Sequence, residues 1–448
     1  MSAQKENHEI DYYLKLLVKS SFFIFFAIVV SKLASYGYKI LIARYFGAET
    51  YGLFSLGLII ITLISSIATL GLNDGLVRYI SLYRGKKKFG YIRRLVISLR
   101  NIFLIVGILF TMILVAFAPI IGEKIFHTEK FTPFLMGMAF SLPFVLLSNL
   151  YLGVLRGFEH VRTYSALINI YQNTFRLIIL FLLIMMGVGV IAVSISYVLV
   201  FVGLFILSNY YAKKDLNKMP KSVIPKSNLV VPEVFSYAWP LLFVGILYSI
   251  FYWTDSLLLG YFTNAENVGW YSAATTVISL FGIAPDIFMQ LFFPLISFKS
   301  SEGKKEIIKR LTQQVTKWIY LINIPLFILL FLFSDYLLGI LFGSEFLIAG
   351  SILKILACGA LFSSVVGIST SLISIKGKTK MVLSNFLVFT IINILLNILL
   401  IPRSGMIGAA IATLITQVLF SITLIVQIKK MYGFNLIRSL RKRLVVIC

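Results

Sequence analysis

Basic side chains inside long apolar stretches are the residues of this sequence that point most directly to chemistry. Lys32 and Arg176 lie near the middle of two such stretches, and Lys39 follows Lys32 by seven residues, on the same helical face. A charge at the centre of a bilayer costs about 2.5–3.5 kcal/mol or more unless it faces a cavity or a partner. These three cations are therefore predicted to line a positively charged lumen that receives an anionic headgroup.

A structural interpretation competes with this one for some of the cations. Lys39, Arg100 and Lys354 lie near the ends of apolar stretches, from which a long side chain can extend its charge to the membrane interface. The remaining cations would then form ion pairs. Lys32 and Arg176 lie too deep to reach the interface easily, so the lumen is the favoured interpretation for these two.

Three acidic residues also fall within apolar stretches. Asp74 lies near the end of one stretch, Asp255 within a second and Asp286 within a third. Asp255 and Asp286 are expected either to exchange H⁺ or Na⁺ or to pair with Lys or Arg, and Asp74 and Lys354 fall under the same two alternatives. Amide side chains add polar patches to the stretches: Asn73, Asn169, Gln172, Asn173, Asn393 and Asn397.

Signals of an enzyme or a metal site are poor. The three histidines are His8, His127 and His160, and the two cysteines are Cys358 and Cys448, so no cluster has the spacing of metal ligands. No glycine-rich phosphate loop precedes a helix, and no polar segment is long enough for a nucleotide-binding domain. We expect no catalytic residue and no metal or other cofactor, and energy from an ion gradient or the substrate gradient.

The elements that must position these residues are membrane helices. The chain has 448 residues, of which 59% are hydrophobic and 13% charged, with a formal net charge of +24. This combination excludes a disordered chain, a disulfide framework and a soluble nucleic-acid binder. Unbroken apolar runs of ~20 residues predict an all-α polytopic membrane protein. Its twelve predicted spans are 20–42, 52–77, 97–121, 133–155, 164–186, 189–211, 234–260, 268–295, 316–342, 349–374, 381–401 and 406–428.

The distribution of basic residues predicts the orientation of these spans. If both termini are cytoplasmic, 32 of the 41 Lys and Arg residues fall on the cytoplasmic side and only four on the outside. The positive-inside rule expects this bias, and a missed span would destroy it. The basic run at 84–88 is accordingly interpreted as a contact with anionic lipid and a topology signal, and no nucleic-acid partner is expected.

An internal repeat divides the chain into two halves. Residues 45–55 resemble residues 261–272 about 217 positions later, Arg156-Gly157 corresponds to Lys376-Gly377, and Gly187 corresponds to Gly405. Six helices in each half is an even number, so the halves are predicted to be parallel repeats. The predicted organisation is an interfacial N-terminal segment, an N-terminal lobe, a cytoplasmic linker, a C-terminal lobe and a basic cytoplasmic tail, at 1–19, 20–211, 212–233, 234–428 and 429–448.

Several short motifs resemble those of a known family. Residues 42–54 (IARYFGAETYGLF) resemble the signature of the polysaccharide flippases, the Wzx-like branch of the MATE-like (MOP) exporter superfamily. Residues 71–74 (GLND), 78–80 (RYI) and 155–157 (LRG) also match, in the same order along the chain. The resemblance covers essentially the whole sequence, and it rests on the order and positions of short motifs.

The resemblance implies a fold, a substrate and partners. It implies a V-shaped protein of two six-helix lobes in the cell membrane that moves a polyprenyl-(pyro)phosphate-linked oligosaccharide to the outer leaflet. It also implies contact with membrane lipids and with glycan polymerase or transferase machinery. In the related lipid II flippases a pair of basic residues on the first helix lines the central cavity; Lys32 matches the first, and Lys39 matches the second with a shift of one residue.

Three other functions compete with a flippase. A MATE-type cation-coupled exporter would suit an acid-rich lumen, whereas the N-terminal half offers three cations against the single acid Asp74. A membrane polymerase or ligase would need a large outer loop, and none is predicted. A sugar permease would carry the pattern Gly-x-x-x-Asp-Arg-x-Gly-Arg-Arg after its second helix, and residues 71–94 do not contain it.

Overall fold

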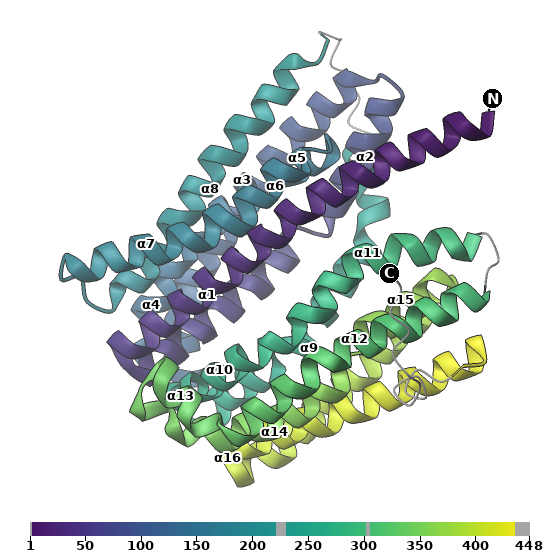
Figure 1. Ribbon diagram of the computed structural model, residues 1–448. Helices are drawn as coiled ribbons and strands as arrows, with labels where there is room; N and C mark the ends of the chain where they lie inside the picture. The colour runs from purple at the N-terminus through teal and green to yellow at the C-terminus, as the bar shows by residue number, and fades with distance from the viewer. Residues whose placement is uncertain (1, 221–229, 302–304, 435–448) are drawn as a thin grey trace. The chain divides into compact units, whose positions relative to one another are not determined.

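The computed structural model describes residues 2–220, 230–301 and 305–434 (Figure 1). Every regular element in these ranges is a helix, as the unbroken apolar runs predict. The physical reason is that a helix pairs its backbone N–H and C=O groups within one segment, whereas lipid offers these groups no hydrogen-bond partner.

The chain forms sixteen α-helices and four short turns of other helical types in its described part. The helices before residue 220 are α1 (Ser2–Ala68), α2 (Leu72–Gly85), α3 (Phe89–Ile120), α4 (Phe131–Ala139), α5 (Leu142–Gly157), α6 (Val161–Ser165), α7 (Gln172–Met185) and α8 (Ile191–Lys218). Those after residue 229 are α9 (Val230–Phe262), α10 (Ala265–Ile278), α11 (Ile283–Ser301), α12 (Lys305–Leu332), α13 (Ser334–Phe342), α14 (Gly350–Ser363), α15 (Val366–Ile375) and α16 (Thr379–Tyr432). The short turns are η1 (Ile121–Ile125), η2 (Ala166–Tyr171), η3 (Ser279–Gly282) and η4 (Ser344–Ala349).

Nine helical stretches within the described ranges are long and apolar enough to cross a membrane. Two of them far exceed the ~20 residues that one crossing needs: Phe26–Ala68 has 43 residues and Thr379–Tyr432 has 54. Each is bent at a glycine with non-helical torsion angles, Gly47 (φ 81°, ψ 176°) and Gly405 (φ 53°, ψ −131°). The sequence predicted loops at 43–51 and 402–405. The structure has a break between two helices at each of these places, but the break is a single glycine in the positive-φ region and not a loop of several residues.

The helices pack into two compact units. The first is Met1–Phe46 with Gly57–Ile246, and the second is Gly47–Leu56 with Leu247–Cys448, each within its described residues. The predicted lobes have different limits, because a short piece of α1 packs with the second unit and the beginning of α9 packs with the first. The predicted linker 212–233 begins within α8, and its residues 221–229 lie outside the described ranges.

The piece of α1 that belongs to the second unit packs there through glycines. A Cβ atom on Gly52 would lie 1.7 Å from the Ala265 carbonyl oxygen, and one on Gly269 would lie 2.0 Å from the Ala48 carbonyl oxygen. Ala48 and Gly52 are four residues apart, as are Ala265 and Gly269, which is the small-xxx-small spacing of close helix crossings in membranes. The two copies of the predicted repeat thus contact each other through equivalent residues.

Each unit has its own apolar core. In the first unit, α2, α3, α5 and the beginning of α9 meet around Leu76, Leu99, Leu150 and Ala238. In the second unit, the core contains Ile319 and other large residues of α11, α12, α15 and α16, among them Phe292, Leu372, Phe389 and Phe420.

A tyrosine anchors the beginning of α9 in the first unit. Tyr83 lies on α2, outside the candidate spans, and its hydroxyl donates to the Glu233 carboxylate over 3.1 Å. Burial raises the pKa of Tyr83 well above its ordinary value, and the adjacent Glu233 carboxylate acts in the same direction. Tyr83 is therefore a neutral hydrogen-bond donor at physiological pH.

Candidate functional site

Arg176 is the most deeply buried of the predicted lumen cations. It lies on α7 with 7% of its surface exposed, and its guanidinium carbon is 4.6 Å from the centre of the Tyr38 ring. Its Nη2 donates to Asn173 Oδ1 over 2.9 Å, and the Asn173 amide donates to Ser31 Oγ over 2.8 Å. The buried Nε atom of Arg176 has no hydrogen-bond partner among the described residues.

The structure brings Lys32 and Lys39 of α1 into the same region of the first unit. Both side chains are half-buried, and Lys39 lies within electrostatic range of Arg176 and Lys32. Three like charges in a partly buried region repel one another unless an anion offsets them. The geometry therefore suits an anionic group, and the role of the three residues in binding stays a prediction.

A polar pocket of about 360 Å³ adjoins Arg176 within the first unit. Its volume is in the range of small-molecule sites. The polar residues that line it are Thr62, Ser65, Ser66, Thr69, Asn73, Asn149, Gln172, Arg176 and Tyr197. Hydroxyls, amides and one guanidinium form a lining that can bind an anion together with sugar hydroxyl groups.

The hydroxyl residues of this pocket did not figure in the sequence prediction. Ser65 and Ser66 follow Thr62 by three and four residues on α1, so the three share one helical face, and Thr69 comes directly after the end of this helix. The hydroxyls of Thr62, Ser66 and Thr69 donate to backbone carbonyls of the preceding turn, as in the 2.7 Å contact of Thr62 Oγ1 with the Leu58 oxygen. The buried Ser65 hydroxyl has no hydrogen-bond partner among the described residues. The spacing was a usable signal for a polar face. The signal was weak, because serine and threonine are common in membrane helices.

Asp255 is the centre of a second polar cluster, which lies in the second unit. Its carboxylate is buried and accepts hydrogen bonds from Tyr271 at 3.0 Å, from the Asn397 amide at 2.8 Å and from the Thr413 hydroxyl. Asn397 also donates to Asn393, while its own Oδ1 atom is buried without a partner in the described structure. No ion pair reaches Asp255 from the described residues. The described contacts of Asp255 are therefore hydrogen bonds, and its role in ion exchange stays a prediction.

The other predicted ionisable residues have partners or lie exposed. Asp74 is 3.7 Å from Arg156, and Lys354 is 3.3 Å from Asp335, with all four side chains partly exposed. These two pairs match the structural alternative that the sequence left open. Asp286 is exposed on α11.

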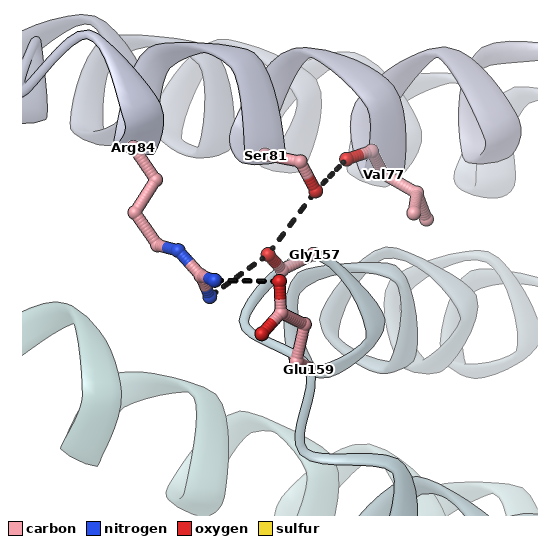
Figure 2. Close-up of polar contacts among 5 residues, drawn as sticks. All are labelled: Val77, Ser81, Arg84, Gly157 and Glu159. Carbon is pink, nitrogen blue, oxygen red and sulfur yellow. Dashed lines mark hydrogen bonds and ion pairs between the residues drawn. The ribbon is translucent and has the colours of Figure 1, made fainter. Parts of the chain in front are cut away.

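Arg84, predicted to contact lipid with its basic neighbours, has protein partners as well. Its guanidinium lies 2.7 Å from the Glu159 carboxylate and donates to the Gly157 carbonyl oxygen over 3.4 Å (Figure 2). The Ser81 hydroxyl reaches the same carbonyl over 3.3 Å and also the Val77 oxygen. The network ties α2 to the turn that follows α5, so the matching 155–157 motif has a structural role in closing that turn.

The described helices define the class of this protein as a multi-pass membrane protein, and its fold is shared with solved membrane transporters. A multidrug resistance MATE family transporter of the MOP superfamily, in an inward-facing conformation, superposes with a TM-score of 0.76 at 12% identity over 90% of this chain and 94% of that one. The lipid II flippase MurJ in an inward closed conformation gives 0.71 at 17% identity, over 94% and 91% of the two chains. At such identities the likeness establishes the fold alone.

The sequence itself defines the family. The model of the polysaccharide biosynthesis protein family matches residues 17–298, and the chain belongs to that family. The model of the lipid II flippase MurJ matches residues 268–448. The family resemblance predicted from the short motifs is confirmed.

Named relatives come from bacteria and archaea. The uncharacterized membrane protein MJ1068 of Methanocaldococcus jannaschii is 24% identical over 394 residues, 85% of this chain and 77% of the relative. The putative O-antigen transporter of Shigella flexneri is 23% identical over 91% of this chain and 96% of its own length. The probable low-salt glycan biosynthesis flippase Agl15 of Haloferax volcanii is 31% identical, but over only 38% of this chain and 35% of its own length.

Proposed function

We propose that this chain is a flippase that moves a polyprenyl-(pyro)phosphate-linked oligosaccharide from the cytoplasmic to the outer leaflet of the cell membrane. The observation that carries the proposal is the group of three cations, Lys32, Lys39 and Arg176, in a chain of the polysaccharide biosynthesis protein family. Relatives named as a glycan flippase, an O-antigen transporter and a lipid II flippase support it.

The chemistry of the first unit fits the headgroup of such a substrate. A phosphate group accepts several charge-assisted hydrogen bonds, and the Arg176 guanidinium, which lines the pocket, can supply one of them. The hydroxyls and amides of the adjoining pocket suit the first sugar. The chain therefore binds and moves its substrate, and the family is one of transporters and not of enzymes.

The proposed topology has twelve crossings with both termini in the cytoplasm. Two helical stretches are long enough for two crossings each, and each has its bend where the sequence places an outer turn. The excess of Lys and Arg in the predicted cytoplasmic segments supports this orientation. Cysteine accessibility at both ends of α1 would test it.

The proposed coupling site is Asp255 with its ring of oxygen atoms. Carboxylate, hydroxyl and amide oxygens are hard ligands that suit Na⁺, and a buried carboxylate also suits H⁺. Thr413 and Asn393 supply oxygen atoms around the carboxylate, and Asn397 has an oxygen without a partner in the described part. Substrate delivery and removal by glycan transferase or polymerase machinery remain part of the proposal.

A MATE-type exporter is the second candidate, because solved structures of that family share the fold. The lining of the first unit argues against it. A pocket beside a buried arginine repels the cationic substrates that an acid-rich lumen would attract.

Transport in proteoliposomes tests the proposed function. Purified protein would be reconstituted with lipid-linked glycan extracted from the source membranes, and a membrane-impermeant lectin would report glycan on the outside. We expect a time-dependent rise in accessible glycan, absent from vesicles without protein. Wild-type protein that leaves the glycan where it began, while exporting a cationic dye, would favour the second candidate.

A further inference from the structure

Two tyrosines in the middle of α9 expose their rings within the second unit. Tyr248 is 52% exposed and Tyr252 is 55% exposed, their ring centres are 4.4 Å apart, and their planes are inclined by 46°. The hydroxyls of the two rings interact with each other, and Asp286 of α11 lies within electrostatic range of Tyr252. Asp286 is itself exposed, so the three side chains share one open face of the unit.

The chemistry of this face indicates that it borders water. An ionisable side chain in the apolar part of a membrane protein faces the bundle interior or a water-filled cavity, because contact with lipid would cost several kcal/mol. Tyrosines that contact lipid gather at the membrane interfaces, whereas Tyr248 and Tyr252 lie well inside the 33-residue helix α9. A face of this kind can contact a transported solute.

Aromatic residues behind the tyrosines hold them in place. The Phe386 ring centre is 6.0 Å from that of Tyr248 and 5.6 Å from that of Phe251, in the latter case edge to face. Phe386 in turn contacts Phe420 of the unit's core at 5.2 Å. The exposed rings are thus mounted on a packed core, and a ligand that binds them pays little entropy for ordering them.

We propose that Tyr248, Tyr252 and Asp286 form a platform for the pyranose rings of the transported glycan. This proposal rests on the proposed flippase function and assigns a sugar subsite to the second unit. The electron-rich face of a tyrosine attracts the positively polarised C–H groups on the apolar side of a sugar ring. The Asp286 carboxylate accepts hydrogen bonds from sugar hydroxyls, while its charge repels a phosphate, so the platform selects the glycan and not the headgroup.

Binding measurements on two probes test the platform. The probes are the native lipid-linked glycan extracted from the source membranes and the sugar-free polyprenyl diphosphate of the same chain length. The variants are a Tyr248→Leu/Tyr252→Leu double variant and Asp286→Asn, with Tyr336→Leu as the matched control, because Tyr336 is a 65% exposed tyrosine of the same unit. Wild-type protein is expected to bind the glycosylated probe more tightly than the sugar-free one.

The expected result is a selective loss. The double variant and Asp286→Asn should each bind the glycosylated probe about tenfold more weakly than wild type and bind the sugar-free probe as wild type does. A tenfold loss of affinity is what the loss of one charged hydrogen bond, or of a comparable stacking contact, is expected to cause. A Tyr248→Phe/Tyr252→Phe variant, which keeps both rings, should retain most of the preference. Unchanged affinity for the glycosylated probe, or an equal loss for both probes, would overturn the platform.

The two proposals fail in different ways. If the wild type transports glycan and the double variant keeps its preference for the glycosylated probe, the platform proposal is wrong and the flippase proposal stands. Failure of the wild type to transport any lipid-linked glycan removes the flippase itself.

Discussion

Replacement of Arg176 by alanine is the sharpest test of the cationic site. The substitution removes the cation that lies 4.6 Å from the Tyr38 ring and donates to Asn173. It also relieves the repulsion between Arg176 and Lys39. A cation–π contact contributes about 0.5–2 kcal/mol, so the loss of packing is modest and partly offset, and the variant is expected to fold.

The effect on the substrate should be much larger than the effect on folding. Loss of one partner of a buried charged pair costs about 2–5 kcal/mol, which corresponds to a factor of ~30 to several thousand in affinity. Arg176→Ala is therefore expected to abolish complementation of a flippase-null strain while the protein still reaches the membrane. Arg176→Lys keeps the charge but loses the planar fork, and it should restore part of the activity.

The assay needs a matched control and a clear contrary result. Arg100→Ala removes an exposed arginine of α3 that donates to the neighbouring Asn101, and it should complement fully. Membrane levels of each variant would be measured by immunoblotting. Wild-type complementation by Arg176→Ala at equal membrane level would refute the cationic-site reasoning.

The remaining predictions concern other parts of the chain. Lys32→Ala should also abolish complementation of the flippase-null strain. If Lys39→Ala complements the same strain as wild type does, Lys39 only extends its charge to the membrane interface. Asp255→Asn should remove the dependence of transport on a Na⁺ or H⁺ gradient in proteoliposomes, and an unchanged ion dependence would exclude the coupling site. Gly52→Leu and Gly269→Leu each place a side chain within 2.0 Å of a backbone oxygen, so each should lower the melting temperature in detergent or prevent folding; normal melting curves would contradict the close crossing.

Much of the architecture followed from local properties of the sequence. Helix type was predictable because lipid leaves the backbone no other partner, and the burial of Arg176 was predictable because apolar residues lie on both sides of it in the sequence. The exact course of the chain at Gly47 was not, because a glycine can end a helix or bend it at similar local cost. Tertiary packing decided between an end and a bend of the helix, because residues Gly47–Leu56 pack with the second unit.

The candidate sites were likewise predictable only in part. The sequence by itself determined which side chains are too costly to face lipid, and it therefore named Lys32, Arg176, Asp255 and Asp286. Only the tertiary structure decided which of them act together, because hydrogen bonds and electrostatic contacts join residues far apart in the chain. Asp255 and Asp286 look alike in the sequence, yet packing buried one among hydrogen-bond donors and left the other exposed near the Tyr252 ring.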